Sequence, residues 1–165
     1  MKRLVILISL SVLCIASTAW AQQLPSVVLK DMRGRSVDTS KLSNNGNPIV
    51  LSFFATWCHP CIRELNAISD EYDEWQEDTG VKVILVSIDD AQNSQKVRPL
   101  VEGQAWDFDV LLDPDGEFKR LMQVQNVPHT FLIDGNGNIV YSHLGYTDGS
   151  ENELYRKIQN CSKQK

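Results

Sequence analysis

Hydrophobic residues along the chain change repeatedly from continuous runs to a spacing of three and four positions. Residues 48–54 are apolar except for Ser52, which predicts a strand that is buried on both faces. Residues 59–78 predict an amphipathic helix, because their apolar side chains recur at helical spacing: Ile62, Leu65, Ile68, Tyr72 and Trp75. Gly80 follows this segment, where a glycine that ends a helix is expected.

The alternation continues to the end of the chain. Short extended pieces are predicted at 26–30 and 36–38, strands at 81–88 and 108–112, a weaker helix at 92–103 that Pro99 interrupts, and a short helix at 117–124. Residues 130–133 and 138–144 flank Asp134-Gly135-Asn136-Gly137, a strong hairpin signal. Ser150 is expected to cap a last helix, with Glu153 as its capping-box partner.

These elements together predict an α/β fold with one central sheet. Long connections separate the early strands, which indicates parallel pairing, whereas the late hairpin is antiparallel. The chain has 165 residues, of which 42% are hydrophobic and 22% charged, as expected for one globular domain. We therefore expect a mixed β-sheet flanked by helices.

The first 21 residues have the layout of a secretory signal peptide. Lys2 and Arg3 precede an apolar run over residues 4–16, and Ala19-Trp20-Ala21 offers an Ala-x-Ala cleavage site. The run is shorter than the roughly 20 residues that span a bilayer. We expect a signal peptide at 1–21, a domain at 22–165, and a periplasmic or secreted protein. An uncleaved leader would instead leave the protein anchored in the membrane.

Charge and cysteine content narrow the function. The net charge of −5 gives no basic field for binding nucleic acid. Four cysteines are too few for a small fold built on disulfides, and cleavage after Ala21 would leave Cys58, Cys61 and Cys161. Outside the cytosol a dithiol is either oxidised or kept reduced by a dedicated supply of electrons.

Cys58-His59-Pro60-Cys61 lies where the buried strand gives way to the long helix. The N-terminus of a helix carries partial positive charge and free N–H groups, which favour a thiolate. Cys58 is expected at that position with a lowered pKa, and Cys61 one turn deeper and better shielded. This asymmetry suits disulfide exchange, in which Cys58 attacks and Cys61 resolves the mixed disulfide.

Other uses of two cysteines at this spacing are less consistent with the sequence. A zinc site needs four ligands, and the further candidates are not paired at ligand spacing: His59, His129, His143 and Cys161. Haem attachment needs a histidine directly after the second cysteine, where this chain has Ile62. A permanent structural disulfide is the stronger alternative, although such tight pairs at helix starts are usually redox-active.

Residues 53–61 resemble the active-site segment of thioredoxin-fold proteins, and especially the extracytoplasmic TlpA/ResA-like thiol-disulfide oxidoreductases. Residues 28–35, 113–116 and 127–135 resemble the same group. The resemblance implies a thioredoxin-like fold, a redox-active Cys58–Cys61 disulfide with no further cofactor and no metal, and a reductase role, often in cytochrome c maturation. It also implies protein dithiol or disulfide substrates and a membrane or extracytoplasmic electron donor.

The resemblance also assigns roles by position. Pro128 matches a cis-proline that lies against the dithiol, and the backbone of Val127 would pair with an extended substrate, with strand packing as its alternative role. Glu64 would exchange protons with Cys61, three residues earlier on the same helix face; otherwise it is a solvated surface charge. Trp57 would be a packing platform beside the dithiol or a substrate contact.

Departures from the family pattern concern the tuning of the dithiol. Ser52 stands where thioredoxins carry a buried Asp, which gives Glu64 more weight. A protonated His59 or His129 near Cys58 would stabilise its thiolate, with a surface histidine as the other interpretation of His129. Pro60 would make the turn between the cysteines rigid.

We expect a monomeric thiol-disulfide oxidoreductase that binds no nucleic acid. One alternative is a thiol peroxidase of peroxiredoxin type, although Ala55 stands where those enzymes carry Thr. Another is a copper- or haem-handling module that uses Cys58, Cys61 and His129. Cys161 has no motif around it and is expected to be a buried small residue or a free thiol rather than a crosslink between chains.

Overall fold

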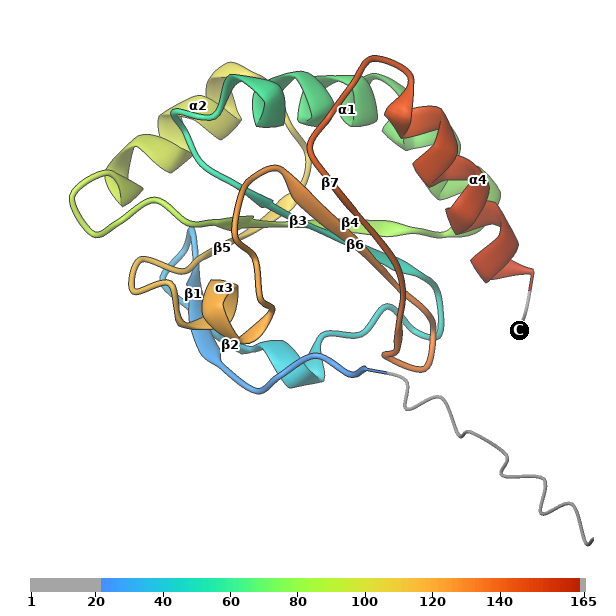
Figure 1. Ribbon diagram of the computed structural model, residues 1–165, viewed down its shortest axis with the longest axis horizontal. Helices are drawn as coiled ribbons and strands as arrows, with labels where there is room; N and C mark the ends of the chain where they lie inside the picture. The colour runs from blue at the N-terminus through green and yellow to red at the C-terminus, as the bar shows by residue number, and fades with distance from the viewer. Residues whose placement is uncertain (1–21, 164–165) are drawn as a thin grey trace, which may run out of the picture.

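A seven-stranded mixed sheet forms the centre of the computed structural model, which describes residues 22–163 (Figure 1). The strands follow the order β2-β1-β5-β4-β3-β6-β7 across the sheet. Their bounds are β1 Val28–Asp31, β2 Ser36–Asp38, β3 Ile49–Phe54, β4 Lys82–Ser87, β5 Asp109–Leu112, β6 His129–Ile133 and β7 Ile139–Leu144. The pairs β3–β4 and β4–β5 are parallel and the other neighbours antiparallel, which confirms the predicted mixed sheet.

Helices cover both faces of this sheet (Figure 1). The helices α1 His59–Thr79, α2 Val97–Gly103 and α4 Ser150–Ser162 share one face, where Leu65, Val101 and Leu154 belong to a single core. The shorter α3 Glu117–Leu121 and the 3-10 helix η1 Thr39–Lys41 lie on the other face. A second 3-10 turn, η2 Ser94–Lys96, leads into α2.

Strand β3 is buried along its whole length, as its continuous apolar sequence predicts. Phe53 faces one core and contacts Phe118 and Phe131, with ring centroids 5.4 and 5.8 Å apart. Phe54 faces the other core, where its ring lies 6.2 Å from that of Trp106. The central position of β3 fixes the point at which α1 starts, directly after a short loop.

Two glycines close the ends of elements near β3. Gly80 ends α1 in the left-handed conformation, with φ 67°, and donates its N–H to Gln76 O over 2.8 Å. Gly135 lies in the β6–β7 turn against the backbone of Gly46, and a Cβ at this position would collide with the Gly46 carbonyl. Both positions therefore require glycine for different reasons, one for its dihedral angle and one for space.

Three expected boundaries are wrong. Pro99 does not interrupt a helix, because α2 begins at Val97 and Pro99 lies in the first turn, where a missing N–H costs no helical hydrogen bond. Ser150 and Glu153 do not form the capping box. Gly149 takes the cap position, with φ 95°, and the hydroxyl of Ser150 bonds to Thr147 instead.

The third boundary is the end of the short helix expected at 117–124. Helix α3 ends at Leu121, because Gln123 adopts a left-handed backbone with φ 57°. Within residues 22–163, no helix is both long and apolar enough to cross a lipid bilayer. The leader expected at 1–21 lies outside the part of the chain that the structure describes.

Candidate active site

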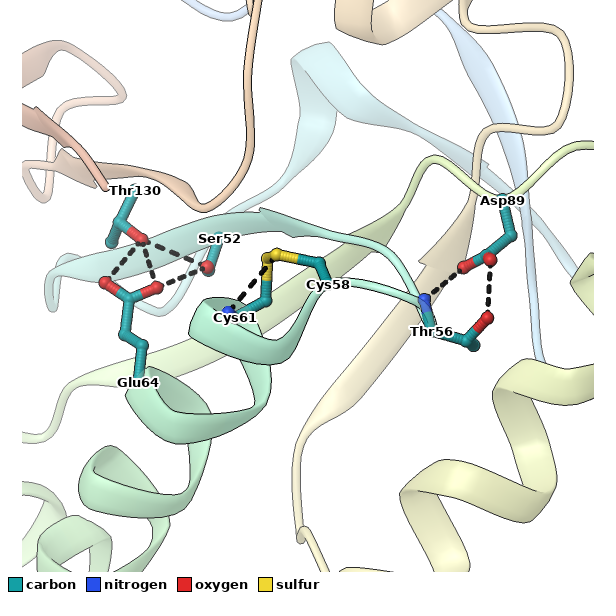
Figure 2. Close-up of a disulfide and its surroundings, with 7 residues drawn as sticks. All are labelled: Ser52, Thr56, Cys58, Cys61, Glu64, Asp89 and Thr130. Carbon is teal, nitrogen blue, oxygen red and sulfur yellow. Dashed lines mark hydrogen bonds between the residues drawn. A yellow bond between two sulfur atoms is a disulfide. The ribbon is translucent and has the colours of Figure 1, made fainter. Parts of the chain in front are cut away.

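Cys58 and Cys61 form a disulfide at the start of α1, with an S–S distance of 2.03 Å (Figure 2). Cys58 is the N-cap of the helix, and its Sγ accepts the backbone N–H of Cys61 over 3.2 Å. Pro60, in the first helical turn, has no N–H to leave unpaired there. The predicted position of the dithiol at the mouth of the helix is confirmed.

The two sulfurs have different surroundings. Cys61 is completely buried, whereas Cys58 retains 4% of its surface, so a partner reaches Cys58 first. The free N–H groups and the positive end of the helix dipole face the Cys58 position, and both stabilise negative charge. The site therefore favours a thiolate on Cys58 when the disulfide opens.

Glu64 is buried one turn along α1 from Cys61 and lies in a network of polar side chains (Figure 2). Only 1% of Glu64 is exposed, which excludes its interpretation as a solvated surface charge. Thr130 Oγ1 lies 3.2 Å from both carboxylate oxygens, and Ser52 Oγ lies 3.4 Å from Oε2. His143 Nε2 approaches the other oxygen, Oε1, to 2.6 Å.

A second buried carboxylate holds the loop that leads to Cys58. Asp89 follows β4, and 1% of it is exposed. It accepts the backbone N–H and the hydroxyl of Thr56 over 2.9 and 2.6 Å (Figure 2). It also accepts the hydroxyl of Ser87 over 2.9 Å. In the same loop, Cys58 N–H donates to Ala55 O over 3.0 Å. Asp89 thus fixes the approach to the dithiol from the side opposite α1.

The residues next to the dithiol form an exposed rim. His59 and Pro60 are exposed, and Trp57 keeps 65% of its surface in contact with solvent. An indole this exposed does not pack into the core, which favours the expectation that Trp57 contacts a substrate. The rim therefore presents an apolar ring and an imidazole beside the less buried sulfur.

The Val127–Pro128 peptide bond is cis, as the resemblance implied. Pro128 is buried, and its carbonyl accepts the N–H of Gly145 over 2.8 Å. Val127 is half-buried, and it precedes the last β3–β6 register pair, Phe53 with His129. Its backbone consequently lies beyond the end of the paired sheet.

His129 is half-buried and stacks on Phe131, with ring centroids 4.3 Å apart. Burial lowers the pKa of His129, and the neighbouring His143 lowers it further. A lowered pKa favours the neutral imidazole near neutral pH, which weighs against a role as a permanent cation beside the Cys58 thiolate. Residue alternation along β6 places Thr130, not His129, on the face that carries Glu64.

Cys161 is not part of this site. Cys161 is a half-buried free thiol on α4, and burial, with a smaller effect of Asp134, raises its pKa. Among residues 22–163, no three His, Cys, Asp or Glu side chains are grouped so that they could hold a metal ion.

No sequence pattern identified Asp89, Thr130 or His143 as members of the active site. His143 was named only as a possible zinc ligand. Two signals were present. Asp89 follows a strand whose last residue is the polar Ser87, and the buried β3 contains one polar residue, Ser52, which needs a buried partner. No local pattern identifies which distant residue provides it.

Comparisons with known proteins agree with this geometry. The AhpC/TSA family model matches residues 20–142. Thiol-disulfide oxidoreductase ResA of Bacillus thuringiensis subsp. konkukian is 27% identical over 136 residues, which cover 82% of this chain and 76% of that protein. The solution structure of a thioredoxin-like protein from Porphyromonas gingivalis is 53% identical, with a TM-score of 0.78, over 86% of this chain and 92% of that one. StoA from Bacillus subtilis is 25% identical, with a TM-score of 0.63, over 81% and 97%. The predicted resemblance and the thioredoxin-like fold are thus confirmed.

Proposed function

Because the chain belongs to the AhpC/TSA family and closes a Cys58–Cys61 disulfide at the start of α1, we propose that it is a thiol-disulfide oxidoreductase. The observation that carries the proposal is the Cys58 sulfur at the N-cap, where it accepts the Cys61 N–H. ResA, a relative of this chain, bears the same activity in its name. The reaction is an exchange of disulfides with a protein substrate.

In the first step the reduced protein attacks. The Cys58 thiolate forms a bond to one sulfur of a client disulfide, the client S–S bond breaks, and the second client sulfur leaves as a thiolate that takes a proton from solvent. The product is a mixed disulfide between Cys58 and the client. The helix terminus supports this step, because it stabilises the attacking thiolate.

In the second step Cys61 releases the client. Its thiolate attacks the Cys58 sulfur, the Cys58–Cys61 bond forms, and the first client sulfur departs as a thiolate. Two electrons have then moved from the cysteine pair to the client. A dithiol donor outside the cytosol returns two electrons to the protein before the next cycle.

Glu64 serves as the proton acceptor for Cys61 in this second step. Positions 61 and 64 lie on one face of α1, and both side chains are buried. Bulk water therefore has little access to Cys61 and does not easily take the place of the carboxylate as proton acceptor. After resolution the proton passes from Glu64 to solvent. Ser52, which stands where thioredoxins carry an Asp, is one of the hydroxyls that meet this carboxylate.

The exposed rim binds the client. The indole of Trp57 offers apolar contact next to Cys58, and Pro128 and the free backbone of Val127 accept an extended segment at the end of β6. His59 and Pro60 tune the dithiol from the first turn of the helix, whereas the lowered pKa of His129 makes a tuning role from β6 the weaker part of this proposal. The protein acts as a monomer that needs no cofactor beyond its disulfide and no metal.

The site of action is the periplasm or the exterior of the cell after removal of residues 1–21, and the protein is anchored in the membrane if that segment remains. The basic and apolar layout of the segment supports this location. An oxidising compartment also requires the dedicated electron donor, in the membrane or outside the cytosol, that the reductase direction demands.

The reduction potential of the Cys58–Cys61 pair tests the direction. Equilibration with glutathione or dithiothreitol buffers should give a value of about −270 mV for a reductase, whereas a value of about −120 mV would mean an oxidant. Rapid consumption of hydrogen peroxide would instead indicate a thiol peroxidase, despite Ala55. Stoichiometric Cu(I) retained on the purified protein would indicate a copper-handling module.

A further inference from the structure

His143 connects the buried carboxylate of Glu64 to the edge of the sheet. Its Nε2 lies 2.6 Å from Glu64 Oε1, and 16% of the His143 side chain is exposed compared with 2% for Glu64. Ser52, Thr130 and His143 occupy paired positions on three neighbouring strands, Ser52 opposite Thr130 and Thr130 opposite His143. One polar row therefore crosses β3, β6 and β7 beneath α1.

The two carboxylate oxygens of Glu64 have different hydrogen-bond partners in this polar row. Oε1 faces His143 and Thr130, whereas Oε2 faces the hydroxyls of Ser52 and Thr130. A hydroxyl both donates and accepts. Ser52 and Thr130 can thus donate to a charged Oε2 and can also accept a hydrogen bond from a protonated Oε2. The Thr130 hydroxyl also lies 3.0 Å from Ser52 Oγ, which lets the two rotate together.

The imidazole of His143 does not have this freedom. Its Nδ1 is buried and has no hydrogen-bond partner within residues 22–163. A proton on Nδ1 would be a buried donor without an acceptor, which is unfavourable in both the imidazolium and the Nδ1–H tautomer. The tautomer with its proton on Nε2 instead donates to Glu64 Oε1 and leaves Nδ1 as an acceptor only.

Charged and titratable groups from four elements face His143. Helix α1 contributes the Glu64 carboxylate, 2.6 Å away, and β6 contributes His129, whose pKa is lowered by burial and then by the neighbouring His143. On β7 itself the ring of Tyr141 lies 5.8 Å from that of His143. From α4, Lys157 places its ammonium group 5.3 Å from the centre of the Tyr141 ring. Glu153, also on α4, acts on Tyr141 with the opposite charge: after burial, it raises the pKa of that phenol.

We propose that His143 is a positioning residue for Glu64: its Nε2–H occupies Oε1 permanently, so that Oε2 is the oxygen that receives the Cys61 proton. This inference rests on the proposed function and on Glu64 as proton acceptor. The proton leaves Cys61 Sγ and resides on Oε2 between the two hydroxyls. The Cys61 thiolate forms the bond to Cys58 while the bond between Cys58 and the client sulfur breaks, and that sulfur leaves as a thiolate. His143 itself neither gains nor loses a proton.

The test uses the pH profile of the resolving step in the reduced protein, with glutathione disulfide as the oxidant. Closure of the Cys58–Cys61 disulfide is followed by acid quenching, alkylation and mass analysis. His143→Leu removes the hydrogen bond to Oε1 that holds the carboxylate, so disulfide closure should need a higher pH. We expect the midpoint of the profile to rise by about one pH unit, the shift that loss of one charge-assisted hydrogen bond produces.

His143→Gln is the matched variant, because its amide retains an N–H donor of similar reach. It should restore the midpoint of the unchanged protein. A wild-type midpoint in His143→Leu, or an equal shift in both variants, would overturn the proposal. If His143→Leu does not fold, ¹⁵N chemical shifts of the His143 ring in the unchanged protein decide: an Nε2–H tautomer between pH 5.5 and 8 supports the role, and an imidazolium at pH 7 rejects it.

The same experiment distinguishes failure of the His143 proposal from failure of the proposed disulfide-exchange activity. If the unchanged protein exchanges no disulfide with glutathione, the proposed function fails, whereas the tautomer measurement still reports on His143. If exchange proceeds and Glu64→Gln alters the profile but His143→Leu does not, only the role of His143 is rejected. In the Glu64→Gln background, His143→Leu should have no further effect on the midpoint.

Discussion

Asp89 accepts both the backbone N–H and the hydroxyl of Thr56, over 2.9 and 2.6 Å, and thereby ties the loop before Cys58 to the end of β4. The carboxylate is buried, so Asp89→Ala would remove the partner of both Thr56 donors and of the buried Ser87 hydroxyl. We expect this variant to lower the free energy of unfolding by about 2–3 kcal/mol. Urea unfolding of the oxidised protein measures it.

Three further variants serve as controls for this prediction. Asp115→Ala removes an exposed carboxylate and should alter stability by less than about 0.5 kcal/mol. Thr56→Ser keeps the hydroxyl, whereas Thr56→Val removes it and should cost about 1 kcal/mol or more. If Asp89→Ala proved as stable as Asp115→Ala, the clamp would have no energetic role.

The unequal burial of the two sulfurs predicts an asymmetric trap. Cys61→Ser leaves the more accessible Cys58 free to attack but removes the group that resolves the mixed disulfide. The variant should therefore accumulate clients on Cys58, visible as complexes on non-reducing gels that dithiothreitol dissolves. Cys58→Ser should accumulate none, and equal trapping by the two variants would contradict the assigned roles.

The elements that local sequence determines were predictable. The apolar run of β3 and the helical spacing of α1 identify those elements because each pattern is complete within a few turns or residues. The CxxC spacing at their junction locates the dithiol for the same reason. The predictions at Pro99 and Ser150 were wrong for different reasons. A proline is tolerated in the first turn of a helix, so Pro99 does not mark an interruption. Gly149 can occupy the N-cap position, so the serine next to it need not be the cap.

The surroundings of Glu64 were beyond prediction from the sequence. Its partners Thr130 and His143 are 66 and 79 residues away, and they meet the carboxylate only because β6 and β7 pair in one register. A shift of one residue would turn both side chains to the opposite face of the sheet. Position in the sequence indicated that Glu64 shares a face with Cys61, but its burial is a property of the assembled sheet.

The buried carboxylate of Glu64 predicts a change in pH profile when it is neutralised. Glu64→Gln keeps the size and several hydrogen bonds but cannot accept the Cys61 proton. We expect disulfide closure to slow by about a hundredfold, the lower end of the range for loss of a general base, with a flatter dependence on pH. Glu77→Gln, an exposed change on the same helix, is the control and should leave the profile as it is. An unchanged profile in Glu64→Gln would remove Glu64 from the mechanism.

The contact between Gly135 and Gly46 predicts that alanine substitution lowers stability by different amounts at Gly135 and Gly137, two glycines of the β6–β7 turn. Gly135→Ala would push a Cβ into the carbonyl of Gly46 and should destabilise the protein by about 1–3 kcal/mol. Gly137 has φ 85° but open space around its Cα, so Gly137→Ala should cost about 1 kcal/mol from backbone strain alone. Thermal unfolding of both variants compares them, and a smaller effect at Gly135 than at Gly137 would contradict the contact with Gly46.

The lowered pKa of His129 predicts a loss of stability in mild acid. Burial, and then His143, favour the neutral ring in the folded protein, so the unfolded chain binds a proton more readily. By linkage, stability is complete above the unfolded value of about 6.5 and falls as the pH drops from there toward the lowered folded value. Asp38, whose pKa the Ser40 hydroxyl lowers from 3.8, acts only at still lower pH.

Urea unfolding at pH 8 and at pH 5.5 isolates this effect. The unchanged protein should be less stable at pH 5.5, and His129→Asn should lose less stability between the two conditions, because asparagine does not titrate. The sign is opposite to that of a histidine held as a cation beside a carboxylate, which would add stability in acid. Equal losses in the two proteins would assign the acid sensitivity to another group, and greater stability of the unchanged protein at pH 5.5 would mean that His129 is charged in the folded state.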